Sequence, residues 1–147
     1  MVQSPRRSPR RPKPAREAAV DVIGRIAAIA LGLMFVVSGG FKIADGPAWP
    51  KMAADLGVSR PLALAVPWYE IVLGALLISG VISPWAEIAA TLTLLAFTVV
   101  IVHRLLDGSR PPCACFGSRS NRPLGRRHVA RNVVLLAVAL IAVAGAA

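Results

Sequence analysis

Two cysteines one residue apart carry the most distinctive chemistry in this sequence of 147 residues. They are Cys113 and Cys115, within the stretch Pro111–Gly117. In an extended chain, residues i and i+2 lie up to roughly 7 Å apart at Cα, near the limit for a disulfide, so a bridge between them requires a turn. The prolines before the pair and the glycine after it favour a turn. Strain in so small a ring would raise its reduction potential, so the bridge would exchange more readily than it would cross-link.

Other uses of the cysteine pair compete with redox exchange. A metal site would need further ligands such as His103 and His128, but zinc pairs are usually Cys-x-x-Cys or more widely spaced, so the sequence predicts no metal site. The cysteines could also be idle, purely structural, or bridged between chains. Redox exchange is the interpretation we prefer, because nearby positive charges favour the nucleophilic thiolate. These charges belong to Arg104, Arg110 and Arg119.

A second group of polar residues lies close to the apolar segments of the chain and is predicted to form a polar network: Lys42, Glu70, Arg104, Arg131 and Asn132. Glu70 lies about two turns inside such a segment, where an ionisable group is costly unless it is paired or faces a polar cavity. Lys42 or Arg131 is its expected partner. At Arg131 a helix N-terminus would oppose the cation, and an ion pair with Glu70 would offset this. Such a pair could lock the helices together, or the group could handle protons or line a cavity.

The composition indicates which elements hold these residues. Hydrophobic residues make up 56% of the chain and charged residues 16%, and the mean hydropathy is +0.64, which is too apolar for a soluble domain of this size. The fold predicted is an all-α integral membrane four-helix bundle. Its spans are expected at residues 20–41, 62–82, 85–106 and 128–147. Residues 45–61 predict an interfacial helix ended by Gly57, whose apolar face carries Trp49, Met52, Ala53 and Leu56.

The number of spans determines which residues share a side of the membrane. The end of the first, the start of the second, the end of the third and the start of the fourth must lie together. That side collects Lys42, Glu70, Arg104, Arg131, Asn132 and the cysteine stretch. Small residues at 38–40 would let another helix approach closely there. Glu87 belongs to the opposite side and is expected to face the lipid headgroups.

Residues 1–18 are basic and rich in proline, so they predict a disordered N-terminal tail preceding a membrane domain at residues 19–147. The net charge of +10 does not indicate nucleic-acid binding, because the basic residues lie in the tail and between the spans rather than along one helix face. Such charges suit contacts with anionic lipid headgroups. The lipid bilayer is therefore the expected partner, and nucleic acid is not.

Several motifs occur in one order along the chain. They are Ser38-Gly39 with Lys42, Val66-Pro67-Trp68-Tyr69-Glu70 with Gly74, Cys113-Ala114-Cys115-Phe116-Gly117, and Arg131-Asn132. Together they resemble the MauE family of methylamine-utilisation membrane proteins, relatives of the DoxX-like group, over about residues 20–142. Ala114 stands where glycine is common in that family. The resemblance implies a four-helix membrane protein that works with a thioredoxin-like partner to produce the disulfide-rich small subunit of methylamine dehydrogenase.

The predicted function is to relay thiol–disulfide exchange at the membrane surface to a thioredoxin-like or disulfide-rich extracytoplasmic partner. Cys113 and Cys115 would be the reactive pair, above the polar network of Lys42, Glu70 and their neighbours. The alternative is a non-catalytic scaffold that docks or assembles a redox enzyme. No cofactor is identified. Quinone-linked electron transfer would need an aromatic or polar pocket that the sequence alone does not reveal.

The expected location is the plasma membrane, with several crossings. Six lysines and arginines in the N-terminal tail favour a cytoplasmic N-terminus, whereas the arginines between residues 110 and 127 would then lie outside, against the positive-inside rule. The first helix usually dominates, and disulfide chemistry favours the extracytoplasmic side. We therefore expect both termini in the cytoplasm and the cysteine loop outside.

Overall fold

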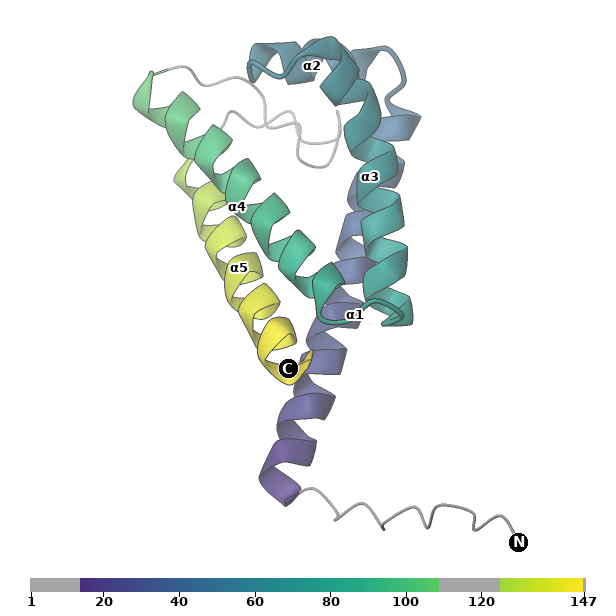
Figure 1. Ribbon diagram of the computed structural model, residues 1–147. Helices are drawn as coiled ribbons and strands as arrows, with labels where there is room; N and C mark the ends of the chain where they lie inside the picture. Colours follow the sequence, from purple (N-terminus) through teal and green to yellow (C-terminus); the bar gives the residue numbers. More distant parts are fainter. Residues whose placement is uncertain (1–13, 109–124, 147) are drawn as a thin grey trace, which may run out of the picture.

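A computed structural model describes residues 14–108 and 125–146 of the chain (Figure 1). Within these residues there are helices and no strands. The helices are α1 (Ala15–Ala44), α2 (Ala48–Asp55), α3 (Arg60–Ser79), α4 (Trp85–Leu106) and α5 (Arg126–Ala146). All but α2 are long and apolar enough to cross a membrane. The prediction of an all-α membrane bundle is confirmed.

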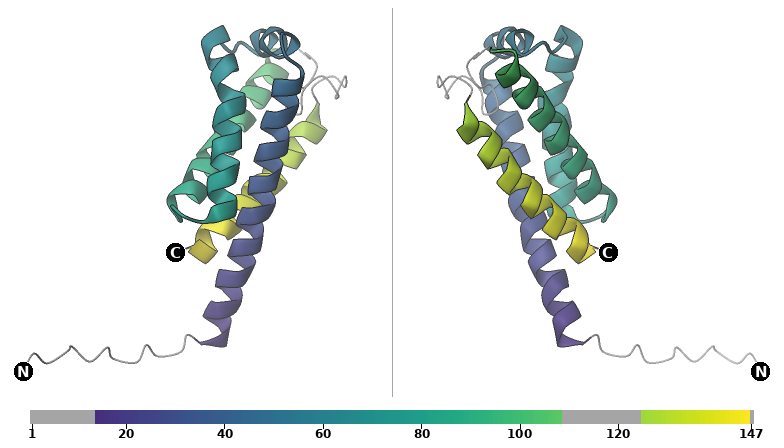
Figure 2. Two further views of the ribbon diagram at one scale, coloured as in Figure 1. Left: turned by 90° about the vertical axis from the view of Figure 1, so that its right-hand side faces the viewer. Right: turned by 90° about the vertical axis from the view of Figure 1, so that its left-hand side faces the viewer.

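Helix α1 is the central element and packs against both α3 and α5 (Figure 2). Glycines allow these close contacts: a Cβ atom at Gly74 would lie 2.5 Å from the carbonyl oxygen of Gly32, and one at Gly24 would lie 2.5 Å from the Cα of Gly145. Without a hydrophobic driving force between helices in lipid, such backbone approach is what holds them. The predicted small-residue contact is present at Gly39, where a Cβ would lie 2.6 Å from the Pro67 carbonyl oxygen.

The helix ends differ from the predicted spans. Helix α1 begins at Ala15, so its first turn lies in the stretch predicted as tail, and its 30 residues extend for about 45 Å, more than the hydrocarbon core requires. Helix α3 ends at Ser79, because Gly80 takes the left-handed conformation with φ of 69°. Arg25 of α1 donates hydrogen bonds there to the carbonyls of Leu77 (2.8 Å) and Ile78. A cation at a helix C-terminus is favoured by the helix dipole and satisfies carbonyls that lack helical partners.

Helix α2 has the predicted apolar face: Trp49 and Ala53 are buried, Met52 and Leu56 pack against them, and Lys51 and Asp55 are exposed. Gly57, with φ of 78°, follows its C-cap. This helix lies across one end of the bundle (Figure 1).

One hydrogen bond attaches α2 to α3 at a gap in the backbone ladder. Pro67 lies inside α3 and has no N–H group, so the carbonyl of Ala63, four residues earlier, lacks its usual donor. The indole Nε1 of Trp49 donates to that carbonyl at 2.5 Å. The tryptophan therefore replaces the bond that proline removes, and it ties α2 to α3 at the same time.

Replacing Trp49 with phenylalanine should destabilise the protein by about 1–3 kcal/mol, because it leaves the buried Ala63 carbonyl without this donor. In a Pro67→Ala background, where residue 67 regains its N–H, the same change should cost less than about 1 kcal/mol. Unfolding of the purified protein in mixed micelles measures both costs. Trp68→Phe, at a side chain 61% exposed, is the control. Equal costs in the two backgrounds would contradict this account of the hydrogen bond.

Helices α3 and α4 form the predicted hairpin, but they do not stay together along their length. They lie close at the turn of residues 80–84 and diverge toward α2 (Figure 1). Midway, Tyr69 and Thr93 share a hydrogen bond of 2.8 Å. Because the Thr93 hydroxyl donates to the Ala89 carbonyl, Tyr69 is the donor. Beyond this bond, the two helices lie farther apart toward α2 (Figure 1).

The expectation that Glu87 faces the headgroups is wrong, since its side chain is only 2% exposed. Glu87 lies on the helical face of Ala90 and Leu94, both of which belong to the hydrophobic core. Ser83 donates a hydrogen bond of 3.0 Å to Oε1, and Oε2 has no hydrogen-bond partner within the part of the chain that the structure describes. The helix dipole favours a carboxylate in the first turn, but the apolar face of α4 turns it inward.

Candidate functional site

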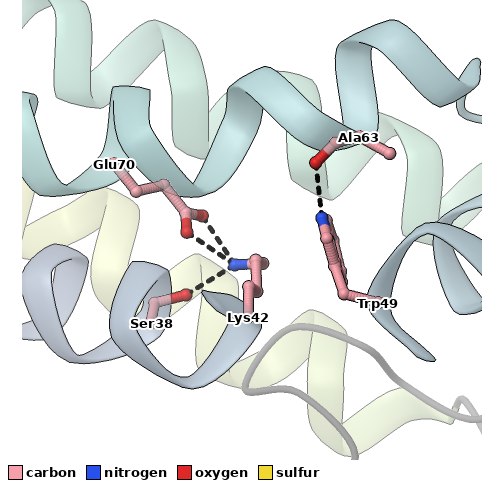
Figure 3. Close-up of polar contacts among 5 residues, drawn as sticks. All are labelled: Ser38, Lys42, Trp49, Ala63 and Glu70. Carbon is pink, nitrogen blue, oxygen red and sulfur yellow. Dashed lines mark hydrogen bonds and ion pairs between the residues drawn. The ribbon is translucent and has the colours of Figure 1, made fainter. Parts of the chain in front are cut away.

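A buried ion pair joins α1 to α3 at the end of the bundle that α2 covers. Nζ of Lys42 lies 2.7 Å and 2.8 Å from the two carboxylate oxygens of Glu70 and donates to the Ser38 hydroxyl at 2.7 Å (Figure 3). Lys42 is 3% exposed and Glu70 1%. These bonds use all three N–H groups of the ammonium, which is the condition for burying a charge at tolerable cost. The sequence left Lys42 and Arg131 as candidate partners of Glu70, and the structure shows Lys42.

Aromatic rings complete the surroundings of the lysine. Its Nζ lies 5.2 Å from the centroid of the Trp49 ring and 5.9 Å from that of Phe97. Cation–π attraction is larger where the cation is desolvated, as here. Trp49 comes from α2 and Phe97 from α4, so Lys42 contacts side chains from three helices besides its own.

Arg131 and Asn132, at the start of α5, line the same cavity as Lys42 and Glu70. Asn132 is buried and its Nδ2 donates to the Thr98 hydroxyl oxygen of α4 at 3.2 Å. The Thr98 hydroxyl in turn donates to the Leu94 carbonyl. Lys42, Glu70, Arg131 and Asn132 of the predicted polar group thus line one cavity, and the Asn132 amide joins α5 to α4.

Arg104 has a different position from the rest of that group. Its Nε donates to the carbonyl of Leu56, the C-cap residue of α2, at 3.1 Å, and its guanidinium lies beside Gly57. A cation again meets the C-terminus of a helix, where exposed carbonyls and the dipole favour it. Arg104 therefore fixes α2 over α4.

Cys113 and Cys115 lie outside the described residues. The C-terminal end of α4 and the N-terminal end of α5 lie at the same end of the bundle as α2 (Figure 1). At these helix ends, His103 pairs with Asp107 at 3.0 Å, and Nδ1 of His128 accepts from the Gly125 N–H at 3.2 Å. Among residues 14–108 and 125–146, no group of three or more His, Cys, Asp or Glu side chains could hold a metal ion.

Sequence reasoning missed several members of the site. Ser38 was read only as a packing residue, although it lies four positions before Lys42 and so on the same helical face. Phe97 and Thr98 gave no signal, because aromatic residues and threonines are ordinary inside a membrane helix. The bond between Trp49 and Ala63 could have been suspected from Pro67, which frees a carbonyl on an otherwise apolar helix.

The fold and this site define a polytopic membrane protein whose helices enclose a polar-ended cavity. The family model described as "Methylamine utilisation protein MauE" matches residues 20–145. The chain belongs to this family, and is therefore a membrane protein of the methylamine-utilisation type. The DoxX-like architecture is compatible with this assignment. Searches of curated proteins and of solved structures returned no match.

Proposed function

We propose that this protein relays thiol–disulfide exchange at the extracytoplasmic face of the plasma membrane. Cys113 and Cys115 cycle between a dithiol and a disulfide: as they become oxidised, a partner disulfide takes up the two electrons and two protons, and the reverse step oxidises a partner dithiol. The partner is a thioredoxin-like or disulfide-rich extracytoplasmic protein. The observation that carries the proposal is the Cys113-Ala114-Cys115 motif in the chain between α4 and α5.

The described residues support this proposal through the bonds that hold the two helices flanking that segment. Both flanking helix ends lie on the side that holds the buried pair of Lys42 and Glu70. Arg104 and Asn132 tie α4 to α2 and to α5, respectively. In the proposed mechanism these bonds are structural: they fix the helix ends from which the reactive segment extends. They exchange no electrons themselves.

The proposed topology has both termini in the cytoplasm. The N-terminus of α1 and the C-terminus of α5 lie at one end of the bundle and α2 at the other (Figure 2). The basic N-terminal tail favours the cytoplasm for the first of these ends, and thiol oxidation favours the extracytoplasmic space for the second.

Labelling of intact cells with a membrane-impermeant maleimide tests side and redox state together. Untreated cells should show little labelling, and mild reduction should make both thiols reactive from outside, because a labile disulfide reduces readily. A single Cys113→Ser or Cys115→Ser variant should trap a mixed disulfide with the partner, visible as a band that reductant removes. The double Cys→Ser variant, which has no cysteine, is the control for labelling.

Three outcomes would count against this proposal. Thiols that never react, together with a double variant that supports partner oxidation as well as wild type, would exclude exchange by the pair. If disrupting the Lys42–Glu70 pair abolished partner oxidation while the double Cys→Ser variant kept it, the protein would be the non-catalytic scaffold instead. Labelling only after the cells are opened would place the cysteines in the cytoplasm.

A further inference from the structure

The helices enclose a cavity of about 210 Å³ at the end of the bundle that α2 covers. All five helices contribute to its walls, which are apolar over most of their area and include the rings of Phe35, Trp49 and Phe97. A cavity of roughly 150 Å³ is enough for one benzene ring in a protein core. This cavity therefore has room for a substituted six-membered ring.

The cavity opens toward the bilayer between α3 and α4. Of its lining residues, Leu62 on α3 and Ala96 on α4 are exposed on the surface of membrane-spanning helices. Leu62 precedes Tyr69 on α3 and Ala96 follows Thr93 on α4, so both lie on the α2 side of the Tyr69–Thr93 hydrogen bond. The two helices diverge in that direction (Figure 1). A ligand would enter sideways from the hydrocarbon phase, and an apolar tail could remain in the mouth.

The polar groups at the inner end are mainly hydrogen-bond donors. Both carboxylate oxygens of Glu70 accept from Lys42, so the pair is neutral as a unit. Asn132 uses one of its two amide N–H groups on Thr98, and Arg131 carries several N–H groups and no acceptor. A ligand suited to this end has oxygen atoms that accept hydrogen bonds. A flat ring fits the aromatic walls better than a flexible acyl chain.

We propose that this cavity binds the head ring of a lipid-soluble quinone, with a ring carbonyl at the second amide N–H of Asn132 and the tail in the mouth between Leu62 and Ala96. The inference deepens the proposed function and rests on it for its purpose. Oxidation of the Cys113–Cys115 dithiol by a quinone gives the disulfide and a hydroquinone, with two electrons and two protons passing to the quinone. When Cys113 and Cys115 have been reduced by oxidising a partner protein, this step would return them to the disulfide form.

Trp49 offers a direct readout, because it lines the cavity and the chain has only two other tryptophans. In a Trp68→Phe, Trp85→Phe background in lipid nanodiscs, decylubiquinone should quench Trp49 fluorescence saturably. Ala96→Phe, which fills the mouth, should weaken binding about tenfold or more. Val99→Phe, at an exposed residue of α4 outside the lining, is the matched control and should bind as the background does. Asn132→Leu should also weaken binding, because it removes the amide that donates to the ring carbonyl, and unchanged binding would overturn this placement of the ring.

Quenching that rises linearly with decylubiquinone concentration and never saturates would overturn the inference. Quenching of the Ala96→Phe variant equal to that of the background would also overturn it. So would displacement by dodecanoate at the concentrations at which decylubiquinone binds, which would assign the cavity to acyl chains. The double Cys→Ser variant should bind decylubiquinone normally, which separates the two proposals. Lost quinone binding with active thiols would reject the cavity assignment alone, and retained binding with inert thiols would reject the thiol function alone.

Discussion

Replacing Lys42 with methionine is expected to destabilise the folded protein by about 3–5 kcal/mol, the cost of leaving one member of a buried ion pair uncompensated. The substitution keeps much of the side-chain volume but removes the donor that both Glu70 oxygens and the Ser38 hydroxyl accept from. It also removes the cation from the faces of Trp49 and Phe97. Unfolding followed by circular dichroism in mixed micelles gives the free energy.

Two further variants make this prediction specific. Lys51→Met makes the same chemical change on the exposed face of α2 and should shift stability by no more than about 0.5 kcal/mol. Lys42→Met combined with Glu70→Leu should recover most of the loss, since an apolar pair of similar size avoids the desolvation of both charges. A double variant as unstable as Lys42→Met alone would mean that lost packing, not the stranded carboxyl group, causes the effect.

Gly74→Leu is the second substitution with a large expected effect. Because the Cβ of any residue at 74 would lie 2.5 Å from the Gly32 carbonyl oxygen and 2.8 Å from a Val36 methyl group, α1 and α3 must move apart. We expect a loss of roughly 3 kcal/mol, at the upper end of overpacking costs, since backbone rather than a flexible side chain obstructs the new atoms. The same unfolding assay measures it.

Gly40 provides the matched control, because it lies in a membrane helix of the same bundle and a Cβ there would meet no atom within 4 Å. Gly40→Leu should therefore be neutral, or stabilising by up to about 1 kcal/mol through helix propensity. If the two leucine variants had the same stability, the close approach of α1 and α3 would not be a determinant of folding. Separation of the helices should also show as increased hydrogen exchange along α1 and α3 in the Gly74 variant.

Much of this architecture could be predicted from the sequence, because hydropathy over about 20 residues reports a membrane span directly. The depth of Glu70 in an apolar segment likewise required a partner. The choice between Lys42 and Arg131 could not be made, since it depends on how α1, α3 and α5 are rotated about their axes. The cavity was also hidden, because it arises from the divergence of α3 and α4, whereas a short turn predicts only that the helices are neighbours.

Two errors had local causes. The first turn of α1 contains Arg16 and Glu17, whose polarity made a helical segment look like tail. Glu87 was assigned to the headgroups from its charge, although Ala86, Ala90 and Leu94 mark its face of α4 as the buried one. In both cases charged residues outweighed the periodicity of the surrounding helix, and periodicity is the better guide to burial.

The glycine contacts of α1 also bear on how freely the chain can vary. One face of α1 meets α3 or α5 at Gly24, Gly32 and Gly39, where almost any side chain would strike backbone. Its opposite face, which includes Ile26, Leu33 and Val37, is exposed on the surface of the bundle and needs only to be apolar in a membrane. A library of single substitutions should therefore divide this helix lengthwise into a strip that accepts nearly nothing and a strip that accepts most apolar residues. The glycine strip that contacts α3 and α5 therefore limits how far the sequence of α1 can change by mutation.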